Sequence, residues 1–240
     1  MRILILADIH ANLSAFQAVI ADAKRYEPEA AVFLGDLIDY GMRPNEVVEQ
    51  MGNLPFPLLI AIQGNHEKAL LHQDISRFST ARGVAMSQYT QAHITADSLK
   101  YLMGLDANGF AEITVDEKRI LMVHGSMEDF FWGKIAPGVN ETVYKPYDVV
   151  LSAHSHRPHC FEQYYSVPDS SYRGEKKTLF INPGSVGQPR NHNPRAQYAV
   201  LDTRFGDVIL ASCSYPIQAE QNLYPSNLPA FYKERLSVGI

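Results

Sequence analysis

The chain repeatedly places a short apolar run directly before an aspartate, asparagine or histidine. The clearest case is the segment 33–39, where an apolar run ends at Gly35 and is followed by Asp36 and Asp39. A carboxylate that emerges from a buried strand costs several kcal/mol unless a cation compensates its charge. Because each of these apolar runs is followed by such a polar residue, we expect the polar side chains to bind metal together at one site. The runs with their polar residues span 4–10, 33–39, 59–67, 120–125 and 149–156.

The first part of the chain has the apolar spacing of an α/β core. Residues 2–7 are too few and too continuously apolar for an amphipathic helix, so they predict a buried strand. Asn12 suits a helix N-cap, and the residues after it carry an apolar stripe of helical spacing. Further strands are expected at 30–34 and 58–63, with a helix at 44–51 between them. In such an alternating order, ligand-binding side chains gather at the carboxyl ends of the strands.

Residues 68–109 have helical spacing, with helices expected at 82–92 and 97–103. Because this stretch directly follows a metal-binding motif, we expect it to be a helical cap insertion beside the site. The polar segment 166–177 and the proline-spaced tail after Tyr215 are too short to divide the chain. We therefore predict one domain over residues 1–240. Later elements are expected as strands at 110–115, 119–123, 148–152, 178–181, 197–201 and 208–212, and as a helix at 228–236.

Composition narrows the class of protein. A chain of 240 residues with 46% hydrophobic residues can bury a full core. Its formal net charge of -5 argues against a protein that binds extended nucleic acid through a basic face. The first apolar run stops at Asp8, too early for a signal peptide or membrane span, so we expect a cytoplasmic protein without a membrane partner. Cys160 and Cys213 are predicted to be two buried thiols rather than a disulfide or a thiolate metal site.

The five motifs, in this order, resemble those of the calcineurin-like metallophosphoesterase superfamily, and the similarity runs nearly end to end. The segment 181–190 resembles its branch of small bacterial phosphodiesterases described as diadenosine-tetraphosphatase-like. The resemblance implies a two-sheet β-sandwich flanked by helices, an αββα arrangement that periodicity alone does not indicate. Tyr40 departs from the arginine that protein Ser/Thr phosphatases have at this position, and Ala153 departs from the usual glycine before His-x-His.

The resemblance also implies a centre of two divalent metal ions. Carried over by motif, the ligands of one ion are Asp8, His10 and His156, and those of the other are Asn65, His124 and His154. Asp36 is the predicted bridge, because one carboxylate can span two ions roughly 3.5 to 4 Å apart. Imidazole, carboxylate and amide ligands suit manganese, iron, zinc, cobalt or nickel, and they leave the choice among these open.

His66 follows the ligand Asn65, so we expect its ring beside the ions as a general acid, as the resemblance also implies. Asp39 is expected to accept a hydrogen bond from His66 and fix its tautomer, with a solvated turn carboxylate as the alternative. The predicted reaction is phosphoester hydrolysis by in-line attack of a metal-activated hydroxide. In that reaction His66 protonates or stabilises the leaving group.

Weaker signals concern the substrate. Arg190 and Arg157 are candidates for phosphate contacts, with rim salt bridges as the alternative. Asn12 is a candidate for a contact with the site, with a plain helix cap as the alternative. The segment 130–132 could stack a nucleobase or anchor the core.

We expect a phosphodiesterase that acts on a small nucleotide or another organic phosphate. A phosphomonoesterase or nuclease of the same fold is the alternative among enzymes. A non-catalytic binding scaffold is the alternative of another class, and it should have lost metal ligands, none of which is missing here. The natural substrate is not readable from the sequence, and homo-oligomerisation stays open.

Overall fold

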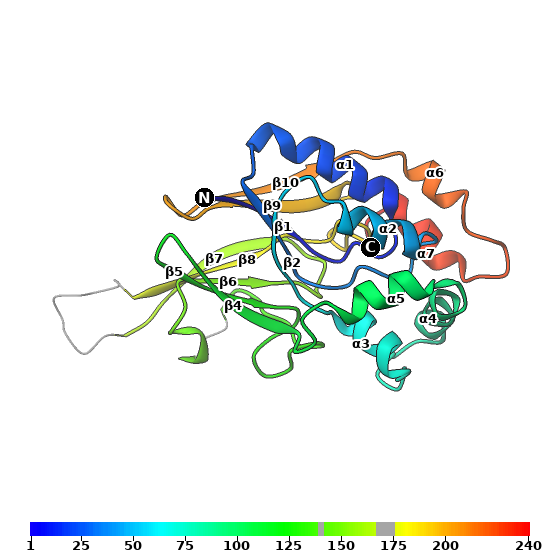
Figure 1. Ribbon diagram of the computed structural model, residues 1–240, viewed down its shortest axis with the longest axis horizontal. Coiled ribbons are helices and arrows are strands. Elements are labelled where there is room, and N and C mark those ends of the chain that lie inside the picture. Colours follow the sequence, from blue (N-terminus) through cyan, green and yellow to red (C-terminus); the bar gives the residue numbers. More distant parts are fainter. Residues whose placement is uncertain (139–141, 167–175) are drawn as a thin grey trace.

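The computed structural model describes residues 1–138, 142–166 and 176–240, which form two five-stranded sheets packed face to face (Figure 1). The predicted two-sheet sandwich is therefore confirmed. Most of the predicted segment 166–177 lies outside the described residues. In the described parts of the chain, no helix combines the length and the apolar character needed to cross a bilayer.

The first sheet has the order β10-β9-β1-β2-β3, with β1, β2 and β3 parallel and β9 and β10 antiparallel. Its strands are β1 (Arg2–Leu6), β2 (Ala30–Phe33), β3 (Leu58–Ala61), β9 (Ala196–Asp202) and β10 (Asp207–Cys213). Helices α1 (Leu13–Ala23) and α2 (Pro44–Gly52) pack their apolar side chains against its outer face. As predicted, Asn12 caps α1, because its side chain accepts a hydrogen bond from the Ala15 N–H at 3.1 Å.

The second sheet has the order β4-β5-β6-β8-β7, with β5, β6 and β8 parallel. Its strands are β4 (Phe110–Val115), β5 (Lys118–Val123), β6 (Val149–Ser152), β7 (His159–Tyr164) and β8 (Lys177–Asn182). The remaining helices are α3 (Asn65–His72), α4 (Ala81–His93), α5 (Ala96–Met103), α6 (Ile217–Gln221) and α7 (Ala230–Glu234). Helices α3, α4, α5 and α7 gather at one end of the molecule, at the right in Figure 1.

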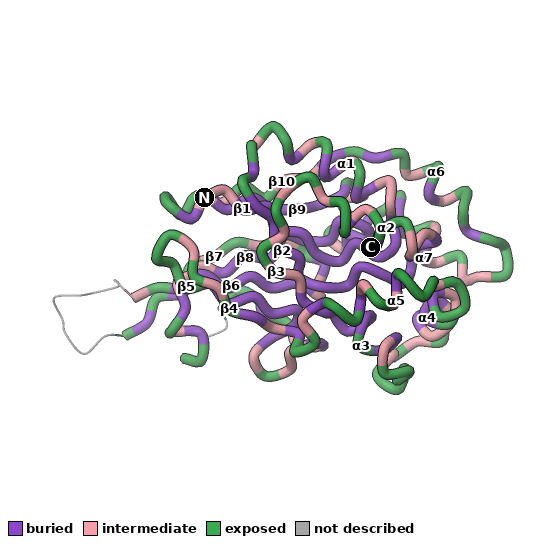
Figure 2. The backbone as a smooth tube through the Cα atoms, viewed as in Figure 1, coloured by how far each residue is buried: buried purple, intermediate pink, exposed green. Residues whose placement is uncertain are grey.

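Strand β1 is buried on both faces, which explains its continuous apolar sequence. Ile3 and Ile5 face the second sheet, where they pack in one core with Met122 and Leu151. Leu4 and Leu6 point to the other side, into the core beneath α1 and α2. Figure 2 shows this buried layer as the purple strands at the centre of the molecule. A strand packed on both faces holds the residues that follow it in a fixed position.

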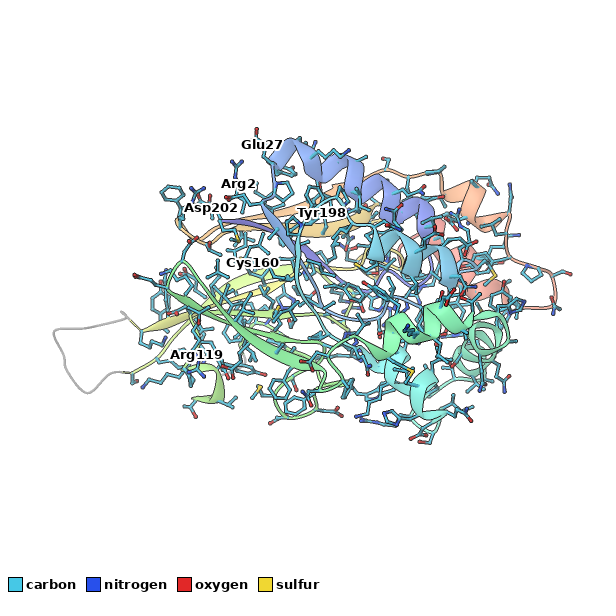
Figure 3. All side chains as sticks on the ribbon, viewed as in Figure 1. Arg2, Glu27, Arg119, Cys160, Tyr198 and Asp202 are labelled. Atoms are coloured by element: carbon cyan, nitrogen blue, oxygen red, sulfur yellow. The ribbon has the colours of Figure 1, made fainter. Side chains whose placement is uncertain are left out.

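Some expectations from the sequence were wrong. Strand β7 and helix α6 were not predicted, and the expected helix over 228–236 is divided into α7 and a 3₁₀ turn at Arg235–Ser237. Cys213 is buried, but Cys160 is exposed on the edge strand β7, where alternate side chains face solvent (Figure 3).

Candidate active site

The polar residues that follow β1, β2, β3, β5 and β6 converge on one place. Several of them have a left-handed backbone, including Asp8 at a φ of 51°, Asp36 at 62° and His154 at 59°. Such angles are uncommon for residues other than glycine, and they cluster at functional sites. The turns are also tightly packed, since a Cβ on Gly64 would lie 2.1 Å from the Asp36 Oδ1 atom. The strand ends therefore adopt strained turns that bring their side chains together.

The first group of side chains comprises Asp8, His10, Asp36 and His156, all buried and able to offer ligand atoms within 4.8 Å of one another. The Nε2 atoms of His10 and His156 are 3.2 Å apart. The His156 Nε2 atom lies 3.4 Å from Asp8 Oδ1, and the His10 Nε2 atom lies 3.7 Å from Asp36 Oδ2. These ligand atoms face a common point.

The second group comprises Asp36, His124 and His154, which also offer ligand atoms within 4.8 Å of one another. The His124 Nε2 atom lies 3.3 Å from Asp36 Oδ2. Asn65 joins this group, because its Oδ1 atom lies 3.0 Å from His124 Nε2 and 2.9 Å from His154 Nδ1. Asp36 is shared by the two groups. The structure thus brings together all seven residues predicted as ligands, in the predicted division.

Backbone carbonyls fix the orientation of three of the imidazoles. The Nδ1 atom of His10 lies 2.9 Å from the Ile38 carbonyl oxygen. The corresponding distances are 2.7 Å from His124 to Leu34 and 2.6 Å from His156 to Gln188. A carbonyl only accepts, so each Nδ1 carries the proton. In a neutral ring the Nε2 lone pair is then free to point into the site, as metal-binding histidines require.

The donor set fits a bound cation. Both carboxylate oxygens of Asp8 are buried and lack a hydrogen-bond partner among the described residues, as does the Nδ2 atom of Asn65. Burial raises the pKa of Asp8 to about 8 and lowers the pKa of His154 to about 3. Buried polar atoms without partners are rare and costly. A cation between the Nε2 lone pairs of His10 and His156 would satisfy the two Asp8 oxygens, whereas the Asn65 amide nitrogen, a donor, needs an acceptor instead.

His66 and Asp39 form a buried pair beside the ligands. The His66 Nδ1 atom lies 2.7 Å from Asp39 Oδ2, and its Nε2 atom lies 4.0 Å from Asp36 Oδ2. Burial alone lowers the pKa of His66, but Asp36 and the hydrogen-bonded Asp39 outweigh it and raise the pKa above its ordinary value. The ring thus pairs with Asp39 through Nδ1, and its Nε2 atom lies on the side of Asp36. Asp39 is not solvated, because it is fully buried.

Glu67 was not predicted to contribute to the site. It is fully buried and accepts four backbone N–H groups, from Asp36 at 2.8 Å, Leu37 at 2.7 Å, Ile38 at 3.3 Å and Gly64 at 2.8 Å. It stands at the third position of α3, where an acidic side chain often returns to the N-cap N–H, so the sequence did carry a local signal. The Glu67 carboxylate joins the turn that carries Asp36 to the turn that carries Asn65.

Replacing Glu67 by glutamine is expected to lower the free energy of unfolding by roughly 2–4 kcal/mol, because an amide cannot accept all four N–H groups. Urea denaturation of the metal-free protein measures this change. The exposed Glu49 provides the control, since Glu49→Gln should change stability by less than about 0.5 kcal/mol. Equal stability of the Glu67→Gln variant and the wild type would contradict the assigned role.

A cavity of about 340 Å³ opens over the ligands. Its wall includes Trp132 of the predicted segment 130–132, together with Arg77, Phe78 and Lys134, which were not predicted. Phe78 lies 5.0 Å from the His66 ring and 5.7 Å from the Trp132 ring, measured between centroids. Arg77 forms an ion pair with Asp129 at 2.7 Å, which links the loop before α4 to the loop after β5. Phe130 and Phe131 do not line this cavity.

The three weaker candidates occupy different positions. Arg190 lines the cavity. Arg157 is exposed, does not line it and donates from Nε to the Arg190 carbonyl at 3.2 Å. Asn12 is buried, and besides capping α1 it donates to the Gly187 carbonyl at 3.0 Å and to the Tyr215 hydroxyl at 3.3 Å. Tyr40 also lines the cavity, with its ring 4.5 Å from His10.

Comparisons with known proteins agree with this geometry. The model of the calcineurin-like phosphoesterase superfamily domain matches residues 1–206. An uncharacterized protein of Methanocaldococcus jannaschii is 28% identical over 242 residues, covering 99% of this chain and 98% of that protein. Phosphodiesterase YfcE of Escherichia coli is 24% identical over 217 residues, which cover 87% of this chain and 91% of that protein. A metallophosphoesterase structure from Sphaerobacter thermophilus, 29% identical, matches with a TM-score of 0.77 over 100% of both chains.

Proposed function

The chain belongs to the calcineurin-like phosphoesterase superfamily, and we propose that this metal-dependent phosphoesterase hydrolyses small phosphodiesters at a centre of two metal ions. The observation that carries the proposal is Asp36, a buried carboxylate common to two sets of ligand atoms. The name of the Escherichia coli relative supports the preference for diesters. A protein of this fold that served only as a binding scaffold would have no need to keep both sets of ligand atoms.

In this proposal Asp8, His10, Asp36 and His156 hold one ion, and Asp36, Asn65, His124 and His154 hold the other. When bound, two such ions supply a hydroxide nucleophile at neutral pH and neutralise the charge on the phosphoryl oxygens. Oxygen and imidazole donors suit manganese, iron, zinc, cobalt or nickel.

His66 holds a proton at Nε2 and delivers it to the departing oxygen. Its Nδ1–H donates to Asp39, which keeps the ring in the orientation that aims Nε2 into the cavity. The hydrogen bond to Asp39 supports this role, because it favours the protonated form of the ring. Asp39 positions the acid and does not itself reach the cavity.

Arg190 is the proposed phosphate contact, because its side chain lines the cavity. Arg157 and Asn12 act on the substrate indirectly in this proposal. Arg157 anchors the Arg190 carbonyl, and Asn12 anchors the segment before Arg190 through the Gly187 carbonyl. We further propose a cytoplasmic protein whose substrate is a small phosphoester rather than extended nucleic acid, which a net charge of -5 disfavours.

The test is hydrolysis by metal-stripped protein to which each divalent ion is added back. Bis(p-nitrophenyl) phosphate, p-nitrophenyl phosphate and a single-stranded oligonucleotide serve as the diester, monoester and nuclease substrates. We expect metal-dependent turnover that is fastest on the diester. Full turnover after chelation and dialysis, or no turnover with any ion, would overturn the proposal. A faster monoester reaction would favour a phosphomonoesterase instead.

The helical insert over 68–109 is proposed to choose among substrates through Phe78. Phe78→Ala should raise KM for bis(p-nitrophenyl) phosphate by roughly tenfold, because the second ring loses an aromatic partner. KM for methyl p-nitrophenyl phosphate, which lacks that ring, should rise much less. The control is Phe205→Ala, since Phe205 is 77% exposed and does not line this cavity. If Phe78→Ala raised KM for both substrates by the same factor while the metal content stayed full, the insert would stabilise the structure without selecting substrates.

A further inference from the structure

Tyr40 is a buried tyrosine in the wall of the catalytic cavity. It is only 8% exposed, and it lines the cavity over the metal ligands. Among the described residues, its hydroxyl has no hydrogen-bond partner. Unlike the carboxylate oxygens of Asp8, the hydroxyl oxygen is not sealed inside the protein. The hydroxyl is therefore a free polar group that opens on the cavity.

The Tyr40 ring lies beside two groups that the reaction uses. Its centre is 4.5 Å from that of the His10 ring and 4.6 Å from that of the His66 ring. His10 belongs to the first ligand group, and His66 Nε2 lies 4.0 Å from the shared ligand Asp36. A phosphoryl group bound between these residues would thus be a neighbour of Tyr40.

The protein holds Tyr40 in an unfavourable backbone conformation. Its φ is 63°, and that of the preceding Asp39 is 66°. Left-handed angles are rare for bulky side chains and persist only where the surrounding structure enforces them. Two tyrosines of the C-terminal segment do so here. The Tyr224 hydroxyl donates to the Tyr40 carbonyl at 2.9 Å, and the Tyr232 ring stacks on the Tyr40 ring at 4.4 Å.

Packing accounts for the ring of Tyr40 but not for its hydroxyl. The ring belongs to a buried cluster that includes Met42, Met86 and Leu236. A phenylalanine would fill the same space, and the hydroxyl of a buried tyrosine usually finds a hydrogen-bond partner. A ligand in the cavity can supply the partner that this hydroxyl lacks.

We propose that the Tyr40 hydroxyl donates a hydrogen bond to a nonbridging phosphoryl oxygen of the substrate and is a further catalytic residue. The inference rests on the proposed function, and it adds an uncharged donor to the contact from Arg190. A hydrogen bond to a charged oxygen is stronger than one between neutral groups. Donors placed where charge develops stabilise the transition state, so the bond should contribute to the rate.

The test compares Tyr40→Phe with the wild type, both loaded with manganese. The change removes only the hydroxyl, so the stacked ring and the metal content should be kept. We expect kcat/KM to fall by about 10- to 100-fold, the range for a hydrogen bond to a charged group. The factor should be equal for bis(p-nitrophenyl) phosphate and for a dinucleoside monophosphate, because both present the same phosphoryl oxygens.

Calorimetry with inorganic phosphate supplies a readout that needs no turnover. Phosphate offers the same kind of oxygens to the cavity, so Tyr40→Phe should bind it about tenfold more weakly than the wild type does. Tyr26→Phe is the matched control, because Tyr26 is a half-buried tyrosine in the 3₁₀ turn after α1 and does not line the cavity. It should change neither the phosphate affinity nor kcat/KM.

Unchanged phosphate affinity and kcat/KM in Tyr40→Phe would overturn the role of the hydroxyl. A loss confined to the dinucleoside monophosphate would also overturn it, because the hydroxyl would then act on the leaving group. Loss of metal ions from the variant would make Tyr40 a structural residue instead. If the wild type turned over neither diester, the proposed function would fail, and phosphate calorimetry would still test Tyr40. A wild type that does not bind phosphate at all would overturn both.

Discussion

Asparagine in place of Asp36 is expected to release both metal ions and to lower kcat/KM for a diester by at least about 10³. The bridging role requires two charged oxygens, and an amide offers one neutral oxygen. Losing the ions removes several kcal/mol of transition-state stabilisation, and each 1.4 kcal/mol is roughly a factor of ten. Asp8 belongs to one ligand group only, so Asp8→Asn should mainly weaken one ion.

Metal analysis of the purified variants measures this directly, as ions per chain. The exposed Asp207, at the start of β10, provides the control, because Asp207→Asn removes the same charge away from the ligands. Manganese should raise the unfolding temperature of the wild type and of Asp207→Asn but not that of Asp36→Asn. Two ions and full activity in Asp36→Asn would contradict a shared ligand.

His66→Asn is expected to slow hydrolysis of diesters with a ribose leaving group by about 10² to 10⁴, the usual range for general-acid catalysis. Nitrophenyl diesters should slow much less, because nitrophenolate departs without a proton. Comparing kcat on a dinucleoside monophosphate and on bis(p-nitrophenyl) phosphate measures the difference. Asp39→Asn should give the same selectivity in milder form, because it misorients the ring without removing it.

Both variants should keep their metal ions, since neither side chain belongs to the two ligand groups. Equal losses on both kinds of substrate would show that His66 binds the phosphate or positions the nucleophile. The general acid would then have to be another residue of the cavity.

The candidate ligands could be predicted from the sequence because each lies in a short segment directly after one of five strands. Parallel strands that share a sheet bring their carboxyl ends to one edge, so local patterns were enough to place Asp8 and Asp36 together. The backbone supports this convergence through the left-handed turns at these residues. Strand β7 gave no such signal, because most of its side chains are at least partly exposed at the sheet edge.

Contacts between distant segments could not be predicted in the same way. Arg235, near the far end of the chain, lies beside the Tyr232 ring of α7, which stacks on Tyr40 of the cavity wall. Nothing in the residues around Arg235 distinguishes it from a surface arginine on an amphipathic turn. Phe78 likewise joins the cavity only because Arg77 binds Asp129 from another loop.

The candidate ligands come from both sheets, which are synthesised at different times. Asp8, Asp36 and Asn65 follow strands of the first sheet, whereas His124 and His154 follow strands of the second. The ribosome delivers β1 to β3 first, then the whole second sheet, and only then β9 and β10, which complete the first sheet. The candidate ligands lie within residues 8–156, so they have all been synthesised before β9 and β10 complete the first sheet. A metal ion held by these residues would join two sheets that were synthesised at different times.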